Sequence, residues 1–213
     1  MSDYTQPRSL QILQALLLSG DCYHALDTNR ETVFAIVPEL RDMVGFAQVH
    51  PYHCRDLWDH TIFSVSQILP DFSLRITMLL HDIGKLSTKS TDHNGLDHFY
   101  GHPEKSVALG GIILDRLGIE EKDCLLILKL IALHDTPLPK QAAELHNWIG
   151  KYGTDFLLKL LQVKRADVLA QSPDKLLSRI SELEETRRLI VALPDFAPEN
   201  SKNKKIDFFQ KKA

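Results

Sequence analysis

The stretch ITMLLHDIGKLST, from Ile76 to Thr88, decides how the rest of the chain is interpreted. A mainly apolar run ends there in His81 and Asp82, and a glycine and a lysine follow at once. The apolar run predicts a helix that is buried in the protein core. Its polar end has two interpretations: a helix terminus that is polar for packing reasons, or one side of a metal site, since imidazole and carboxylate both bind divalent cations.

The rest of the chain also has a helical pattern. Apolar residues recur at three- and four-residue spacing, and strand signals are scarce. We therefore expect an all-α bundle of about eight or nine helices. The segments with this pattern are 9–20, 27–40, 54–70, 71–84, 102–118, 120–135, 140–153, 154–172 and 173–193.

Short local signals bound some of these helices. Thr28 and Glu31 form a capping-box pattern, Asp71 is a candidate N-cap, and Gly118 is a candidate stop. The one exception to the helical pattern is the polar segment around Asn94-Gly95. That dipeptide predicts a tight turn, so we expect a small hairpin or an irregular loop there.

Composition limits the class of protein. The chain has 213 residues and a mass of 24.2 kDa, which suits one well-cored domain with or without a small appendage. Its formal net charge of −3 argues against a general nucleic-acid coat but permits a local basic patch. No apolar stretch approaches the roughly 20 residues that span a bilayer, and no signal peptide is recognisable. Three widely spaced cysteines favour a reducing compartment, so we expect a cytoplasmic protein with no membrane partner.

Histidine is the unusual residue in this composition. The chain has 10 histidines, and most of them lie between residues 50 and 102, close to Asp82, Asp92 and Asp97. Such clustering has two explanations: a transition-metal site, or chance enrichment in a solvated loop.

The spacing of two histidines distinguishes these explanations further. His60 lies ten residues before Pro70, and His81 lies eleven residues after it. If the two helices pack antiparallel across a turn at Pro70, each arm runs for about 15 Å at about 1.5 Å per residue. The two histidines then lie level with each other across a helical hairpin, where both can contact one ion.

Two residues farther along the chain are candidates for the same site. Asp167 lies among apolar residues, and a buried carboxylate needs a partner, so it is either a metal ligand or the salt-bridge partner of Lys164 or Arg165. His134 ends an apolar helix in a His-Asp pair, as His81 does. It is therefore either a ligand or a helix-terminal histidine that the helix dipole favours.

Other polar residues are candidates for contact with a substrate. Lys85 follows Asp82 by three residues, so it either reaches a substrate phosphate as a point charge or is solvated. Arg165 is a further candidate for phosphate binding. The loop that contains His98 precedes His102, so we expect it to cover the site, with His98 either assisting in binding or serving only the loop.

The ordered set His60, His81-Asp82 and Asp167 resembles the H…HD…D pattern of the HD metal-dependent phosphohydrolase superfamily. The stretches HDIGK, HFYGH and RADVLAQSP extend the likeness over roughly residues 38–173, and they resemble the HD module of bacterial tRNA CCA-adding nucleotidyltransferases. The chain contains no Asp-x-Asp pair and no strand-rich head. The resemblance is therefore to the HD module standing alone, and nucleotide addition is not implied.

The resemblance implies a helical HD fold that holds one or two divalent ions, of Mn, Fe, Ni, Co, Zn or Mg. The first ion would be held by His60, His81, Asp82 and Asp167. In binuclear members the positions of His102 and His134 hold a second ion, with Asp82 as the bridge. Asp82 and Lys85 would then serve catalysis, and Lys85, His98 and Arg165 would bind substrate.

The activity implied is hydrolysis of a phosphomonoester or a cyclic phosphodiester by metal-activated water. The substrate would be a phosphorylated nucleotide or an RNA end. Two other readings of the same pattern stay open: a non-catalytic HD-fold module that binds nucleotide or RNA, and a di-iron HD oxygenase. The oligomeric state stays open as well.

The expected domain organisation has three parts. Residues 1–50 would form a helical neck-like segment packed on the core, and residues 51–195 would form the HD domain. Residues 196–213 form a tail that contains lysines and two phenylalanines. That tail is either a frayed terminus or a contact arm for RNA or a partner subunit.

Overall fold

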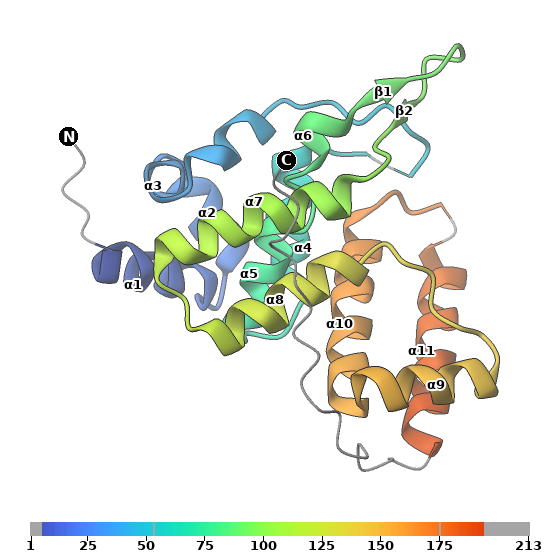
Figure 1. Cartoon of the computed structure of the whole chain (residues 1–213). Helices are drawn as coiled ribbons and strands as arrows, with labels where there is room; N and C mark the ends of the chain where they lie inside the picture. Colours follow the sequence, from blue (N-terminus) through green and yellow to red (C-terminus); the bar gives the residue numbers. More distant parts are fainter. Residues whose placement is uncertain (1–5, 53, 175, 194–213) are drawn as a thin grey trace, which may run out of the picture.

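The structure is a computed structural model, and it describes residues 6–52, 54–174 and 176–193. Helices dominate these residues, which confirms the all-α prediction (Figure 1). In chain order the elements are α1 Gln6–Leu17, α2 Cys22–Thr28, α3 Arg30–Ile36, the 3-10 helix η1 Pro38–Met43, α4 Leu57–Ser66, α5 Phe72–Leu80, α6 Lys85–Thr88, β1 Ser90–Thr91, β2 Asp97–His98, α7 His102–Leu117, α8 Glu121–Leu133, α9 Ala142–Tyr152, α10 Thr154–Ala170 and α11 Leu176–Ala192.

The described residues form eleven α-helices, more than the eight or nine expected. The two that the pattern missed are the short helices α2 and α6. The prediction of a capping box that starts at Thr28 is wrong, because Thr28 is the last residue of α2. Asn29 ends that helix instead, since both its backbone N–H and its side-chain amide donate to the carbonyl of Ala25. Asp21 caps the start of α2 by accepting a hydrogen bond from the His24 backbone N–H at 3.2 Å.

Helices α4 and α5 form the predicted hairpin across Pro70. Asp56 caps α4 by accepting from the Asp59 N–H at 2.7 Å, and Asp71 caps α5 by accepting from the Leu74 N–H at 2.9 Å. Each cap satisfies an N–H group that has no partner within its helix. The start of each helix of the hairpin is therefore set by its own local sequence.

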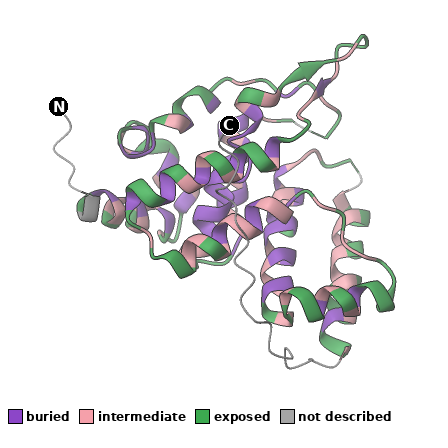
Figure 2. Ribbon diagram, viewed as in Figure 1, coloured by how far each residue is buried: buried purple, intermediate pink, exposed green. Residues whose placement is uncertain are grey.

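One hydrophobic core joins the N-terminal helices to the later ones. Leu13 of α1 and Val33 of α3 are fully buried in the same cluster as Ile76 of α5 and Leu114 of α7. Figure 2 shows the buried faces of these helices turned toward one another. Helices before α4 therefore contribute to the same core as the later ones. The domain boundaries themselves stay predictions, and the tail at 196–213 lies outside the described residues.

A two-stranded antiparallel hairpin interrupts the helices, as the Asn94-Gly95 signal predicted. It pairs Ser90 with His98 and Thr91 with Asp97, and Gly95 has a φ of 78°, which suits a residue without a Cβ. The preceding chain runs beside this hairpin, because Val49 and Asp97 exchange two hydrogen bonds of 2.7 and 2.8 Å. In the described parts of the chain, no helix is both long and apolar enough to cross a bilayer.

Candidate metal centre

Six polar side chains from five helices converge between the α4–α5 hairpin and the helices that pack on it. Two of these side chains belong to the C-cap residue of an apolar helix, and two lie in the first turn of a helix. Five of the six are at least 93% buried, and the sixth, Asp167, is largely shielded. The positions are His60 in the first turn of α4, His81 at the C-cap of α5 and Asp82 after it, His102 at the start of α7, His134 at the C-cap of α8 and Asp167 near the end of α10.

Four of these residues form a first group of ligand atoms. The Nε2 atom of His60 lies 3.3 Å from Oδ2 of Asp82 and 3.2 Å from Oδ1 of Asp167. The Nε2 atom of His81 lies 3.2 and 3.7 Å from the same two oxygens. The hairpin therefore does bring His60 and His81 level, with ring centroids 5.6 Å apart.

A second group shares Asp82 through its other oxygen. Oδ1 of Asp82 lies 3.2 Å from Nε2 of His102 and 3.5 Å from Nε2 of His134. The two histidine nitrogens lie only 3.1 Å from each other. The carboxylate of Asp82 thus faces one group with each oxygen, which is the arrangement that a bridging ligand requires.

Each histidine is held by its other ring nitrogen. The Nδ1 atoms lie within hydrogen-bonding distance of backbone carbonyls: Ala170 for His60, Met78 for His81, Phe99 for His102 and Ile131 for His134. A carbonyl oxygen can only accept, so each Nδ1 carries the hydrogen. In the neutral imidazole, Nε2 then has a lone pair and faces the centre of the site, the orientation typical of metal-binding histidines.

The donor set fits a divalent ion at each group. Ligand atoms within each group lie within 4.8 Å of one another. Atoms that bind one ion at about 2.1 Å are expected roughly 3 to 4 Å apart. The Nε2 atoms of His102 and His134 lie 3.1 Å apart, and because each Nδ1 carries the hydrogen, neither neutral ring has a hydrogen to donate between them. A shared cation satisfies these atoms, whereas packing alone does not.

The electrostatics of these side chains follow from burial and from the two carboxylates. Burial lowers the pKa of His81, but the charges of Asp82 and Asp167 outweigh it and raise the pKa to about 10. Burial also acts on Asp82 by raising its pKa, but His81 and Lys85 outweigh it and hold that pKa well below the usual range. Burial lowers the pKa of His134, which favours the neutral ring that a metal ligand must be.

Lys85 is not a solvated surface lysine. Its side chain is buried, and Nζ donates to Oδ2 of Asp82 at 2.6 Å and to the side-chain oxygen of Gln48 at 2.9 Å. The ammonium group also lies 5.3 Å from the centre of the Phe99 ring. Lys85 therefore contacts a ligand oxygen directly, and no sequence signal indicated that Gln48 would hold it there.

Asp167 faces His60 and His81 instead of the neighbouring cations. Lys164 is turned to the carbonyls of His134 and Thr136, to each of which Nζ donates at 2.6 Å. Arg165 lies on the opposite side of α10, with Nε 4.0 Å from Glu184. Residues two apart on a helix point about 200° apart, so Arg165 and Asp167 do not share a face.

His98 lies at the edge of the site without joining either group. Its Nε2 atom lies 3.1 Å from Oδ2 of Asp92, and its ring stacks on Tyr100. The loop that was expected over the site is the β1–β2 hairpin, which leads directly into His102 at the start of α7.

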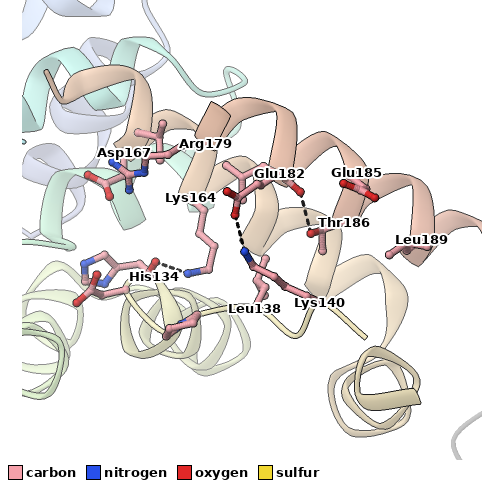
Figure 3. A pocket seen from close by; sticks show the side chains of 14 residues that line it. His134, Leu138, Lys140, Lys164, Asp167, Arg179, Glu182, Glu185, Thr186 and Leu189 are labelled. Carbon is pink, nitrogen blue, oxygen red and sulfur yellow. Dashed lines mark hydrogen bonds and ion pairs between the residues drawn. The ribbon is translucent and has the colours of Figure 1, made fainter. Parts of the chain in front are cut away.

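A cavity of about 570 Å³ adjoins the two groups, and the sequence did not indicate it. It lies between the segment after α8, helix α10 and helix α11, and His134 and Asp167 form one end of it. Figure 3 shows Arg179 beside Asp167, with Lys164 and Lys140 farther along. Burial lowers the pKa of Lys164 to about 8. No local motif marks Arg179, which reaches the site only because α11 packs on α10.

Gln171 connects Arg179 to the ligands. Its Nε2 donates to Oδ2 of Asp167 at 3.0 Å, and its Oε1 accepts from Arg179. The carboxylate can only accept and the guanidinium can only donate, so the amide has one possible orientation. Gln171 follows Asp167 by four residues on the chain, a spacing that places neighbours on one helix face and that could have revealed it.

Comparison with known proteins agrees with this geometry. The model of the HD domain family matches residues 60–172, a span that begins at His60 and includes every candidate ligand described above. This chain belongs to the HD domain family. HD domain proteins are generally metal-dependent hydrolases. No curated protein matches the chain, and the likeness to the CCA-adding HD module stays a prediction.

Proposed function

We propose that this HD domain protein is a metal-dependent phosphohydrolase that cleaves a phosphomonoester or a cyclic phosphodiester of a nucleotide or of an RNA end. The observation that supports it best is the shared carboxylate of Asp82, which faces a separate ligand group with each oxygen. A cavity opens on the same residues, and Arg179 and Lys164 line it near Asp167, together with Lys140 and the carboxylates of Asp135, Glu182 and Glu185. Metal ligands beside cations are the combination that phosphoryl chemistry requires.

The residues would divide the work as follows. His60, His81 and Asp167 hold one ion with Asp82, and His102 and His134 hold a second. Bound divalent ions would lower the pKa of a water ligand and neutralise charge on phosphoryl oxygens. Imidazole-rich donor sets suit Mn, Fe, Co, Ni and Zn better than Mg.

Cations around the ligands have different tasks. Lys85 donates to Asp82, so it fixes the bridging carboxylate and offsets its charge, and we assign it to positioning. Arg179 lines the cavity and has a planar group that suits bidentate phosphate binding. We therefore assign substrate phosphate to Arg179, with Lys164 beside it, while Arg165 lies on another face.

Hydrolysis assays test this proposal. The purified protein is incubated with 2′,3′-cyclic nucleotides and with 2′- and 3′-monophosphates, in the presence of Mn²⁺, Ni²⁺, Co²⁺ or Mg²⁺. We expect turnover with at least one metal, loss of turnover in Asp82→Ala, and a raised KM in Arg179→Ala. Arg165→Ala is the matched control, because that side chain faces away from the ligands, and it should keep wild-type kinetics.

Two results would overturn the proposal. Turnover that survives Asp82→Ala would place the chemistry elsewhere. Absence of turnover with every metal, combined with no stoichiometric metal after reconstitution, would favour the non-catalytic binding module instead.

A further inference from the structure

The C-terminal end of α8 is held differently from the C-terminal end of α5, although both helices end in a His-Asp pair. After His81 the chain stays in the core, since the residues through Lys85 are all buried. After His134 the chain leaves the core: Asp135 is exposed, and residues 135–141 form an irregular segment before α9. Because helix ends fray, a ligand at the end of α8 needs a contact that holds it in place.

Lys164 of α10 provides this contact. Its Nζ donates to the carbonyl oxygens of His134 and Thr136, in each case at 2.6 Å, and Figure 3 marks the bond to His134. Carbonyls at a helix C-terminus lack partners within the helix, and the helix dipole favours a cation there. The ammonium group thus satisfies the end of α8 and attaches it to α10.

Burial distinguishes Lys164 from a surface lysine. The residue is only 9% exposed, and two of the three N–H groups of its ammonium donate to the two carbonyls. Taking an ammonium group out of water costs free energy unless it is well hydrogen-bonded. The attachment to α8 therefore accounts for a buried lysine at this position, although Lys164 also lines the cavity.

No other contact described above does the same for His134. Its Nδ1 donates to the carbonyl of Ile131 at 2.7 Å, which fixes the ring relative to its own helix. That bond does not set the distance between the end of α8 and Asp82, whose Oδ1 lies 3.5 Å from Nε2 of His134. The attachment to α10 acts on that distance, because it joins α8 to another helix of the site.

Helix α10 carries a candidate ligand of the first group as well. Asp167 follows Lys164 by three residues, a spacing that places two side chains on one face of a helix. Oδ1 of Asp167 lies 3.2 Å from Nε2 of His60. One face of α10 therefore supports both groups, the first through a ligand and the second through the lysine that holds His134.

We propose that Lys164 is a positioning residue for the second ion: by fixing the end of α8 on α10, it keeps His134 at the distance from Asp82 that a shared ion requires. Lys164 acts through His134 and does not itself bind the ion. The inference rests on the proposed function for the presence of two ions, but not for the reaction that they serve. Loss of the ammonium group should therefore weaken the second ion selectively.

Metal titration of the full-length protein tests this role. Metal-free protein is titrated with Co²⁺, followed by visible absorption, and the number of bound ions is measured at saturation. The first group has two carboxylates and the second has only the shared one, so the first group should fill first. Electron paramagnetic resonance with Mn²⁺ provides a second readout, because two ions that share the Asp82 carboxylate are spin-coupled and a single ion is not. Neither measurement depends on turnover.

Two substitutions remove the ammonium group. Lys164→Met keeps the apolar stem of the side chain. Its first Co²⁺ should bind as in the wild type, whereas the second should bind about 10- to 100-fold more weakly, the loss typical when a partner of a ligand is removed. The spin-coupled Mn²⁺ signal should fall with it. Lys164→Gln keeps a polar end but lacks the charge and the reach, so it should show the same selective loss, and it replaces Lys164→Met if that variant does not fold.

Two further variants serve as comparisons. Lys140→Met removes a cation from the same cavity, but Lys140 pairs with Glu182 at 2.9 Å and should leave both binding steps unchanged. Gln171→Ala removes the partner of Asp167 and should weaken the first ion instead. Opposite selectivity of Lys164→Met and Gln171→Ala would show that each acts on one group, and the ion that each variant retains shows that it is folded.

The outcomes separate this inference from the proposed function. A wild type that binds only one ion, folded Lys164 variants that bind both ions normally or weaken both equally, or the same loss in Lys140→Met would overturn the inference even if hydrolysis is observed. Selective loss of the second ion supports it even if no substrate is cleaved, in which case only the proposed hydrolysis fails.

Discussion

At the residue scale, three of the four histidines are held in the same way. His81, His102 and His134 each donate from Nδ1 to the carbonyl three residues earlier, at 2.7 to 2.9 Å. His81 and His134 are helix C-caps, where carbonyls lack partners within the helix. One hydrogen bond thus satisfies a helix end and turns Nε2 toward the site.

Gln171 provides a first prediction at this scale. Gln171→Ala removes the donor that orients Asp167, so metal affinity should fall about 10- to 100-fold, as is typical when a partner of a ligand is lost. The measurement is a Co²⁺ titration followed by visible absorption, which needs no substrate. Gln141→Ala changes an exposed glutamine away from the ligands and serves as control. Equal Co²⁺ affinity in wild type and Gln171→Ala would contradict the prediction.

Tyr23 provides a pH prediction away from the metal centre. Its phenol donates to Asp59 at 2.6 Å, and this hydrogen bond, aided by slight burial, raises the pKa of Tyr23 to about 12. Because the folded state favours the protonated phenol, the bond stabilises the fold fully below pH 10, the ordinary tyrosine pKa. The contribution is lost as pH rises toward 12.

Tyr23→Phe measures that contribution. Its free energy of unfolding should lie below that of the wild type by a constant amount up to about pH 10, and the gap should narrow above it. Denaturant unfolding at a series of pH values provides the measurement. A gap that is constant through the alkaline range would show that the hydrogen bond does not protect the phenol.

At the scale of elements, the approach of α7 to the end of α5 depends on Gly84. Gly84 has an ordinary φ of −65°, so its backbone conformation does not require a glycine. Its role is close packing instead. A Cβ at this position would lie 2.2 Å from the carbonyl oxygen of His102 and 2.6 Å from the Ser106 nitrogen, both of them backbone atoms.

Gly84→Ala should therefore push α7 away from the hairpin and separate His102 from Asp82. Overpacking of this kind costs about 1–3 kcal/mol, which urea unfolding would detect. Gly111→Ala is the matched control within α7, since the nearest atom to its added Cβ is a leucine methyl 3.8 Å away. That control should be neutral or stabilising by up to about 1 kcal/mol. Equal stability of the two variants would contradict the packing argument.

At the scale of the whole molecule, the metal centre connects helices that are distant in sequence. The candidate ligands come from α4, the end of α5, α7, the end of α8 and α10, so bound ions would cross-link most of the bundle. Only the folded chain assembles these groups. Metal binding and folding stability should therefore be coupled.

Metal removal tests that coupling. At a free metal concentration of about 100 times Kd, one ion adds about 2.7 kcal/mol, which raises Tm by about 5–10 °C for a chain of this size. Thermal unfolding followed by circular dichroism, with metal and with chelator, provides the comparison. Asp82→Ala should lose the metal-dependent rise, whereas Arg165→Ala should keep it. A Tm that does not respond to metal would contradict the prediction.

Much of this architecture was predictable because it depends on neighbours in the sequence. The apolar spacing predicts the long helices, and Asp71 and Asn94-Gly95 mark a helix start and a turn that the structure confirms. The level of His60 with His81 follows from counting residues on either side of Pro70, since a helical hairpin has a fixed rise per residue. These features belong to single elements or to elements joined by a short turn.

Other features depend on packing between elements that are far apart in the chain. Arg179 borders the cavity and Arg165 does not, because of the helix faces that meet where α11 packs on α10. The same contacts turned Lys85 onto Asp82 and Gln48, and they made Gly84 a packing residue. The sequence by itself determined the helices and the set of candidate ligands. Only the tertiary structure decided that Asp82 is shared between two groups. One of its oxygens faces α4 and α5, which precede Asp82 in the chain, and the other faces α7 and α8, which follow it.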